Sequence, residues 1–293
     1  MLSVLIPVYN YDVFTLVQTL YNQASECRIP FEIICIDDNS QHFLSENQEI
    51  NKFKNTSFLI LEKNIGRSAI RNLLAQKAAY ENLLFLDADT IPVHENFISN
   101  YIQQINNHEK VVYGGILYEN IKPSHNQLLR WIYGRNREAL NISARNKNPY
   151  LSFLTLNFLI TKSIFKKVSF NEEIPNLRHE DTLFSFDLMQ NNIEVTHMEN
   201  PVYHLGLEDS KTFLIKSEQA VLALKNLVDS NMISAQYVKL SHYFQIIKKY
   251  HFRTLIAFNF KIIKLLFVKQ LLGKKPSLFI FDLYRLGHYC TLN

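Results

Sequence analysis

The sequence predicts an α/β protein in which a mostly parallel central sheet is flanked by helices and followed by a C-terminal helical extension. Short apolar runs alternate with helix-length segments, and this alternation predicts the parallel sheet. Several of these runs end in acidic residues, which is typical of strands that lead into a ligand-binding edge. From Ser210 onward the pattern is helical throughout. We therefore divide the chain into a domain over 1–206 and a helical extension over 207–293.

Composition limits the classes of protein that fit. The chain has 293 residues, of which 47% are hydrophobic and 20% charged, and this excludes a disordered protein. A net charge of +4 is too mild to indicate a nucleic-acid partner. The cysteines Cys27, Cys35 and Cys290 form no CxxC pair, which predicts a reducing compartment without disulfides or a zinc site. We expect a cytoplasmic protein, because the N-terminus shows no secretory signal and no apolar run reaches the roughly 18 residues of a membrane span.

Each expected strand is a short apolar run bounded by polar or turn-forming residues. The expected strands cover 2–8, 31–36, 57–61, 82–86, 110–117, 151–161, 194–197 and 201–204. Helices are expected over 12–25, over an Ala- and Leu-rich stretch at 68–80, from Pro92 to about Asn107, over 180–190 after a linker with Pro175, and in three or four segments from Ser210. Strands that alternate with helices of this length imply right-handed crossovers and parallel pairing.

The segment 121–150 departs from the alternation, because it is polar and basic and contains the only tryptophan, Trp131. The residues that flank Trp131 are apolar, so we assign it to an amphipathic core helix. Stacking of the indole on a sugar is the alternative.

The strand over 82–86 ends in two carboxylates, Asp87 and Asp89, one residue apart. Both can serve one site if the backbone turns at Ala88. Oxygen ligands of this kind suit Mg²⁺ or Mn²⁺ shared with substrate phosphates. The alternative is a solvated turn. The strand over 31–36 also ends in acids, Asp37 and Asp38, and two acidic strand ends at one edge are harder to explain as turns.

Five motifs in order give the chain a resemblance to a known family. They are Pro7-Val8-Tyr9-Asn10, Asp37-Asp38-Asn39-Ser40, Asn64-Ile65-Gly66-Arg67 with Ala69-Ile70-Arg71-Asn72, Asp87-Ala88-Asp89, and Glu180-Asp181 opening a helix. In order and spacing they resemble the family 2 glycosyltransferases, which have the Rossmann-like GT-A fold and transfer sugars from nucleotide donors with inversion. The resemblance covers roughly residues 2–206, and Val202-Tyr203-His204-Leu205-Gly206 resembles a form common in bacterial members.

The resemblance implies a role for individual residues. Nucleotide-sugar binding is implied for Pro7, Val8, Tyr9, Asp38, Gly66, Arg67, Arg71, Asp87 and Ala88. Asp89 matches the ligand of an Mn²⁺ or Mg²⁺ cofactor, and Asp87 and His204 could complete the metal shell. Asp181 matches the base that deprotonates the acceptor hydroxyl, with Glu180 beside it to orient the acceptor. A structural salt bridge is the alternative for Arg71, and His179 is the competing base.

The implied function is a metal-dependent inverting glycosyltransferase. It would move a sugar from a nucleotide diphosphate-sugar, with a UDP-sugar as the first expectation, to a hydroxyl of a glycan or lipid-linked acceptor. The implied process is synthesis of cell-surface polysaccharide or lipooligosaccharide. One alternative is a sugar nucleotidyltransferase, although the loop after the first strand lacks the usual glycines and basic residues. Another is a non-catalytic, membrane-associated module that binds nucleotide-sugars. The absence of a GxxxxGK[ST] motif excludes a P-loop ATPase.

A basic amphipathic pattern occupies the helical extension. At 100° per residue, Arg253, Lys261, Lys264 and Lys269 fall within one arc of about half a helix, and the opposite side is aliphatic and aromatic. Such a helix can lie on an anionic membrane surface, here the inner face of the cytoplasmic membrane. It can equally close the protein's own core or a dimer, and the pattern leaves both interpretations open.

Overall fold

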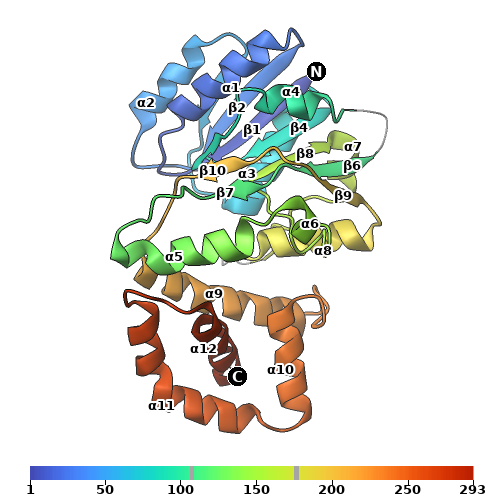
Figure 1. Cartoon of the computed structure of the whole chain (residues 1–293). Coiled ribbons are helices and arrows are strands. Elements are labelled where there is room, and N and C mark those ends of the chain that lie inside the picture. Colours follow the sequence, from blue (N-terminus) through green and yellow to red (C-terminus); the bar gives the residue numbers. More distant parts are fainter. Residues whose placement is uncertain (106–108, 175–177, 293) are drawn as a thin grey trace. The chain divides into compact units, whose positions relative to one another are not determined.

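A seven-stranded sheet forms the centre of the first part of the chain in a computed structural model that describes residues 1–105, 109–174 and 178–292 (Figure 1). Its strands, in spatial order, are β3 (Thr56–Ile60), β2 (Phe31–Asp37), β1 (Leu2–Val8), β4 (Asn82–Leu86), β8 (Asn157–Thr161), β6 (Lys110–Tyr113) and β9 (Glu194–His197). Only β8 runs antiparallel to its neighbours among these described strands. The predicted mostly parallel sheet is therefore confirmed.

Because β1, β2 and β4 are parallel and in register, the loops that follow them leave the sheet at the same edge. Val8 pairs with Asp37, and Leu5 pairs with Phe85. This edge holds the motifs that the sequence placed after these strands.

A second, three-stranded sheet within the described residues contains β5 (Thr90–Pro92), β10 (Val202–His204) and β7 (Ile116–Leu117). The single strand predicted over 110–117 is wrong, because the chain is divided between β6 in the large sheet and β7 in the small one. Gly115 has a positive φ of 102°, a conformation that suits glycine and breaks the strand there. The predicted strand over 151–161 is also too long, since β8 begins at Asn157.

Apolar side chains on both sides of the large sheet are covered by helices. On one side α3 (Arg67–Lys77), α7 (Lys162–Lys167) and α8 (Glu180–Gln190) contribute Ile70, Phe165 and Phe184 to a cluster with Leu5 and Phe85. Strand alternation turns Val4 and Ile6 to the other side, and both are fully buried. On that side α1 (Phe14–Glu26) and α4 (Phe97–Ile102) lie together, and the Ile98 N–H donates to Gln23 at 3.1 Å.

Several helix boundaries differ from those expected. The helix expected from Pro92 to Asn107 is shorter, because Thr90–Pro92 forms β5 and α4 ends at Ile102, while Asn107 and the linker residue Pro175 lie outside the described residues. Short helices not expected from the sequence are α2 (Leu44–Gln48), α6 (Ile142–Arg145) and α7, with single helical turns at Glu49–Lys52, His125–Gln127 and Gly134–Glu138.

The described residues divide into two compact units. The first comprises Met1–Leu117, Ala139–Asn176 and Glu180–Gly206, and the second comprises Tyr118–Glu138, Leu177–His179 and Leu207–Asn293. The last change of unit falls between Gly206 and Leu207, where the sequence placed a domain boundary. The segment Tyr118–Glu138 differs from the expected division, because its helix α5 (Leu128–Tyr133) buries Leu129 with residues of the second unit.

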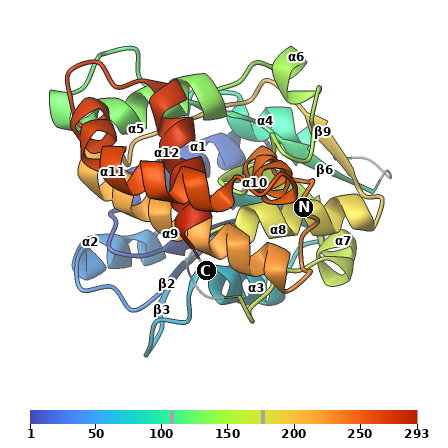
Figure 2. The same cartoon turned by 90° about the horizontal axis from the view of Figure 1, so that it is seen from below.

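The second unit is helical. Besides α5 it contains α9 (Ser210–Asp229), α10 (Lys239–Lys249), α11 (Arg253–Leu271) and α12 (Leu278–Thr291). The helix α12 contacts α9, α10 and α11 (Figures 1 and 2), and it contributes Phe281 and Tyr284 to a core that it shares with α5, α9 and α11. Trp131 of α5 donates its indole N–H to the Glu119 carbonyl at 2.9 Å and packs under Arg135.

The basic arc predicted for α11 is partly wrong, because two of its members face the interior of the second unit. Arg253 donates to the carbonyls of Cys290 and Leu292, at 3.2 and 2.7 Å. Lys264 forms an ion pair with Glu218 at 2.7 Å. Lys261 and Lys269 are exposed. Among the described helices, none combines the length and the hydropathy that a membrane crossing requires.

Candidate active site

The two aspartates after β4 lie at the turn that joins the two sheets. The chain turns at Ala88 and Asp89, as expected, and continues directly into β5. The Thr90 hydroxyl donates to the Asp87 carbonyl at 2.7 Å, and the Asp87 N–H donates to the Leu156 carbonyl at 3.0 Å. These bonds fix the backbone between the two carboxylates.

Asp89 lies beside His204, the histidine predicted to share a metal ion with it. The two residues come together because β5 pairs with β10, with Thr90 opposite His204. The His204 Nε2 lies 3.3 Å from the Asp89 Oδ2, and the Leu205 N–H donates to the Asp89 carbonyl at 2.8 Å. Gly206 passes so close that a Cβ on it would lie 2.3 Å from the Asp89 Oδ2. Only a glycine therefore leaves this carboxylate where it is.

Asp87 has a different partner, the guanidinium of Arg71. The Arg71 Nη2 donates to the Asp87 Oδ1 at 2.7 Å, and the Arg71 side chain is only 6% exposed. Burial raises the pKa of Asp87, and the charge of Arg71 partly offsets that rise. Of the two interpretations of Arg71, the structure contains the salt bridge.

Glu180 and Asp181 open α8 and have opposite pKa shifts. Burial alone would raise the pKa of Glu180, but Arg67 and Arg71 outweigh it and hold the pKa below its usual value. Arg67 donates to the Glu180 carboxylate at 3.3 Å. For Asp181, burial and the charge of Glu180 raise the pKa to about 6. The N–H of Thr182 donates to the Asp181 Oδ1 at 2.7 Å, which is too little to reverse that shift.

These residues form one electrostatic cluster. Arg67 is influenced by Glu180, Asp87 and Asp181, while Asp87 is influenced by Asp89. Two guanidinium groups, from Arg67 and Arg71, thus lie among four carboxyl groups, which is a formal excess of two negative charges when all four are ionised. Such an excess attracts a divalent cation. No three His, Cys, Asp or Glu side chains within the described part of the chain lie together as they would around a metal ion.

The loops after β1 and β2 are joined by the acids predicted there. Asp37 accepts from the Ser40 N–H at 2.7 Å and from its hydroxyl at 2.6 Å, and that hydroxyl accepts from the Asn10 N–H at 2.6 Å. Pro7 and Val8 end β1, and Tyr9, which follows it, is 57% exposed.

Asp38 supports a loop as well as lying in the candidate nucleotide site. Its carboxylate accepts the N–H groups of Ile65 at 2.7 Å and Gly66 at 3.0 Å, and Asn64 donates to its carbonyl at 3.0 Å. Gly66 has a positive φ of 87°, which glycine adopts without strain. In this structure Asp38 therefore fixes the loop that leads to Arg67.

One aromatic residue near the cluster was not expected from the sequence. Burial raises the pKa of the Tyr11 phenol, and the charges of Asp89 and Asp12 raise it further. Its position directly after Pro7-Val8-Tyr9-Asn10 was the only signal that could have found it. His179, the competing base, adjoins Glu180 in sequence but belongs to the second unit.

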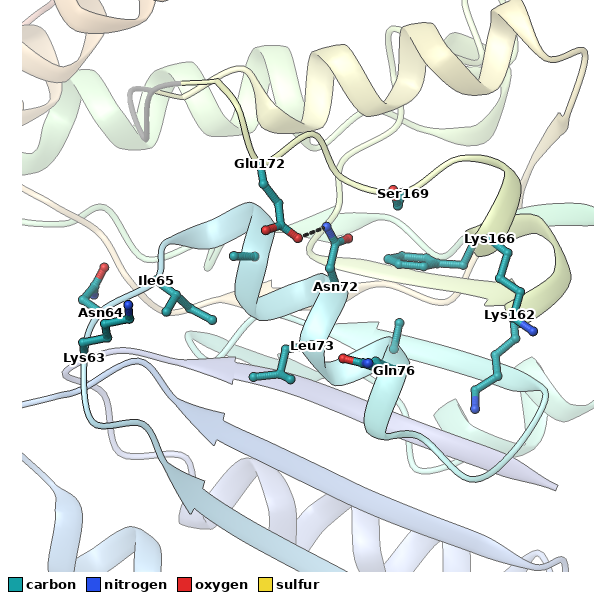
Figure 3. Close-up of a pocket in the computed structure, with 13 residues that line it drawn as sticks. Lys63, Asn64, Ile65, Asn72, Leu73, Gln76, Lys162, Lys166, Ser169 and Glu172 are labelled. Atoms are coloured by element: carbon teal, nitrogen blue, oxygen red, sulfur yellow. Dashed lines mark hydrogen bonds between the residues drawn. The ribbon is translucent and has the colours of Figure 1, made fainter.

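A separate hollow lies over α3 and α7 and has a volume of ≈ 1040 Å³ (Figure 3). Lys63, Lys162, Lys166 and Asn72 line it, and Asn72 donates to Glu172 at 2.7 Å. Its lining includes none of the predicted site residues. The candidate active site is therefore the acidic cluster at the sheet edge.

Solved structures with a similar fold are glycosyltransferases or carry nucleotide-sugars. The chain resembles S. aureus TarS 1–349 (TM-score 0.50, 20% identity, 77% of this chain and 65% of that one) and its complex with UDP-GlcNAc (TM-score 0.51, 20% identity, 77% and 66%). It also resembles the mannosyltransferase PcManGT from Pyrobaculum calidifontis in complex with GDP-Man and Mn²⁺ (TM-score 0.53, 12% identity, 78% and 64%). The chain thus spans slightly less than two thirds of these structures, and at these identities the likeness is one of fold.

The fold and the acidic edge define a GT-A glycosyltransferase. The chain is 24% identical over 211 residues to an uncharacterized glycosyltransferase of Haemophilus influenzae, covering 70% of this chain and 80% of that protein. It is 34% identical over 94 residues to an uncharacterized glycosyltransferase of Rickettsia bellii, covering 31% and 13%. Residues 3–170 match Glycosyl transferase family 2. This match spans more than half of the chain, which therefore belongs to that family.

Proposed function

We propose that this glycosyltransferase is metal-dependent and inverting, and that its donor is a nucleotide diphosphate-sugar, with UDP-sugars first. The sugar goes to a hydroxyl of a glycan or lipid-linked acceptor in the synthesis of cell-surface polysaccharide or lipooligosaccharide. The observation that carries the proposal is the acidic cluster, in which Asp89 adjoins His204 and Asp181 has a raised pKa. The acceptor and the process rest on the resemblance to bacterial family members.

Inversion needs a single base, and Asp181 has the properties of one. With a pKa of about 6, its carboxylate is ionised at neutral pH and basic enough to accept a proton from the attacking hydroxyl. Glu180, held by Arg67 and with a lowered pKa, stays ionised and suits a role in orienting the acceptor. The proton leaves the acceptor oxygen as that oxygen bonds to the anomeric carbon, and the nucleoside diphosphate departs from the opposite face.

The residues present fit a divalent metal that is shared with the donor. Asp89 and His204 offer one oxygen and one nitrogen ligand, a pair that Mn²⁺ accepts. Two protein ligands leave coordination positions for the oxygens of a diphosphate. When bound, the cation neutralises charge on the departing nucleotide. Asp87 keeps its salt bridge to Arg71, so we assign it to donor contact or to the metal through water.

The nucleoside part of the donor lies, in this proposal, against the joined loops after β1 and β2. Tyr9 offers an exposed aromatic ring, and Asp38 keeps lone pairs beyond the two that accept backbone N–H groups. The UDP-GlcNAc and GDP-Man bound by TarS and PcManGT support the donor class.

A donor panel tests the proposal. The full chain is titrated with UDP-, GDP- and dTDP-sugars in Mn²⁺, in Mg²⁺ and in EDTA, while binding and slow donor hydrolysis are followed. We expect one nucleotide class to bind more tightly with metal than in EDTA, and Asp89→Ala to abolish the metal-dependent part. Glu208→Ala, which removes an acid next to His204–Gly206 in sequence but outside the cluster, serves as the control. Equal donor binding by Asp89→Ala and the wild type in Mn²⁺ would exclude Asp89 as a ligand.

A further inference from the structure

An exposed row of large apolar side chains runs along α11. The row consists of Leu255, Phe258, Ile262, Leu265 and Leu266, which are 56%, 63%, 63%, 79% and 66% exposed. Their spacing places them on one side of a helix. We call this row the α11 apolar face. Phe252 before the helix, at 54%, and Phe279 in α12, at 70%, are also exposed.

The opposite side of α11 already serves the core of the second unit. Phe260 and Leu271 are buried there, and Phe260 packs against Tyr284 of α12. Arg253 and Lys264 are on that same side and have partners within the unit. This side of α11 already supplies the contacts of the helix with the core. The exposed apolar side chains on the other side are therefore not needed to close the core. Large apolar patches of this kind are uncommon on soluble proteins unless they bind something.

The stretch of sequence that carries the α11 apolar face has charges of one sign. Residues 230–281 contain no Asp or Glu, and they contain nine Lys and Arg residues. Lys261 and Lys269 are exposed on α11 itself, and the exposed Lys274 and Lys275 follow the helix directly. This charge repels a second copy of the same surface, which argues against a symmetric dimer. It attracts an anionic surface.

We propose that the α11 apolar face binds the surface of a bilayer that contains anionic phospholipids. In this arrangement α11 lies in the plane of the interface, its apolar side chains enter the acyl boundary, and the flanking lysines contact the headgroups. The inference goes beyond the proposed sugar transfer and does not depend on it, because it concerns helices of the second unit only.

Co-sedimentation with vesicles tests the proposal. The full chain is mixed with vesicles of phosphatidylglycerol and phosphatidylcholine, or of phosphatidylcholine alone, at low and high salt. Binding is expected to the anionic vesicles and to fall at high salt, because screening weakens the lysine contacts. Leu265→Gln combined with Ile262→Gln should weaken binding about tenfold or more, since two buried aliphatic side chains are lost. Ile121→Gln is the matched control, because Ile121 is 80% exposed and lies outside α11.

A second pair of variants tests the charge. Lys261→Gln with Lys269→Gln should weaken binding to anionic vesicles about fivefold for each lysine removed. Lys54→Gln with Lys77→Gln removes the same charge from exposed positions in the first unit and should leave binding unchanged. Circular dichroism and thermal melting of all variants confirm that they remain folded.

Three outcomes would overturn the proposal. The first is a wild-type chain that stays in the supernatant with anionic vesicles at low salt. The second is vesicle binding that Leu265→Gln with Ile262→Gln leaves unaltered. The third is a wild-type dimer, measured by light scattering, that this double variant converts to a monomer. Nucleotide binding is measured on the same samples, so loss of vesicle binding with intact nucleotide binding separates this inference from the proposed function.

Discussion

Arg71 holds the Asp87 carboxylate at 2.7 Å, whereas the neighbouring Asp89 lies 3.3 Å from His204. The two acids of the motif Asp87-Ala88-Asp89 are therefore not equivalent. One has a guanidinium cation as its partner, and the other has an imidazole, a side chain that often binds metal ions. The roles proposed above, donor contact for Asp87 and metal binding for Asp89, are based on this difference between their partners.

Breaking the Arg71–Asp87 pair should destabilise the fold. Arg71→Met keeps most of the volume but leaves the partly buried Asp87 carboxylate, which is 32% exposed, without its partner, so the free energy of unfolding should fall by about 2 kcal/mol. The pKa of Asp87 should rise further. Arg67→Met is the matched control, because Arg67 is 52% exposed and its pair with Glu180 should contribute less than about 1 kcal/mol. Urea unfolding measures both variants, and a larger loss for Arg67→Met would contradict this account.

A single methyl group should disturb the metal site without removing a ligand. In Gly206→Ala the new Cβ would lie 2.3 Å from the Asp89 Oδ2, so that carboxylate must move. We expect the Mn²⁺ affinity of the donor complex to fall about tenfold or more while metal-free nucleotide binding is kept. Gly273→Ala, where the nearest atom is a carbonyl oxygen at 3.2 Å, should bind like the wild type. Calorimetry with and without Mn²⁺ measures these affinities. An unchanged Mn²⁺ affinity in Gly206→Ala would mean that Asp89 is not a metal ligand.

The base should be visible in the pH dependence of transfer. Because the pKa of Asp181 is about 6, kcat/KM should rise with pH and level off above that value. Asp181→Asn should lower transfer by roughly 10²-fold or more with donor and metal binding retained. Glu180→Gln should cost less, mostly in acceptor affinity, and should move the midpoint to lower pH because it removes a charge that raises the pKa of Asp181. Transfer that survives in Asp181→Asn but is lost in Glu180→Gln would exchange the two roles.

The same carboxyl should make the protein less stable at neutral pH. A carboxyl whose pKa is raised from 3.8 to about 6 on folding contributes stability that is fully present below about pH 4 and lost as the pH rises through about 6. Asp181→Asn removes the ionisable group, so it should be more stable than the wild type at pH 7.5, by roughly 3 kcal/mol. The difference should shrink towards pH 4. Thermal melting across this range measures it, and a variant less stable than the wild type at pH 7.5 would refute the raised pKa.

The proposed role of Asp38 in nucleotide binding can be tested separately from its role in fixing the loop. Asp38→Ala should weaken UDP binding by roughly 1.5–3 kcal/mol through a lost charge-assisted hydrogen bond. Asp37→Ala is the control, because it removes an equal charge and a carboxylate that fixes the adjacent loop through Ser40. Equal losses of UDP affinity in the two variants would mean that both act by releasing loops, and Asp38 would then be no ligand.

Local sequence was sufficient for the elements with strong patterns. The strands β1 and β4 and the helix α8 have the predicted bounds, because each is a regular run between polar residues. The strand predicted over 110–117 was wrong, and the sequence could have shown this, because Gly114 and Gly115 interrupt it. The pairing of β5 with β10 could not be predicted, because strands of three residues are too short to show a periodic pattern.

At the candidate site the acidic residues could be predicted from the sequence, but the residues that pair with them could not. Asp87 and Asp89 followed from their position after a strand, whereas the pairing of Arg71 with Asp87 depends on how α3 packs on the sheet. The backbone donors that occupy Asp38 come from a loop 27 and 28 residues away, which no local pattern indicates. For α11 the sequence predicted a basic side and an apolar side, but only the packing shows that Arg253 and Lys264 lie on the inner side.

The run of 52 residues without a carboxylate, 230–281, also determines how that surface responds to its surroundings. Its lysine and arginine residues have no acidic neighbour within the run that could offset their charge. Attraction to anything anionic is therefore tuned by ionic strength and by the charge density of the partner.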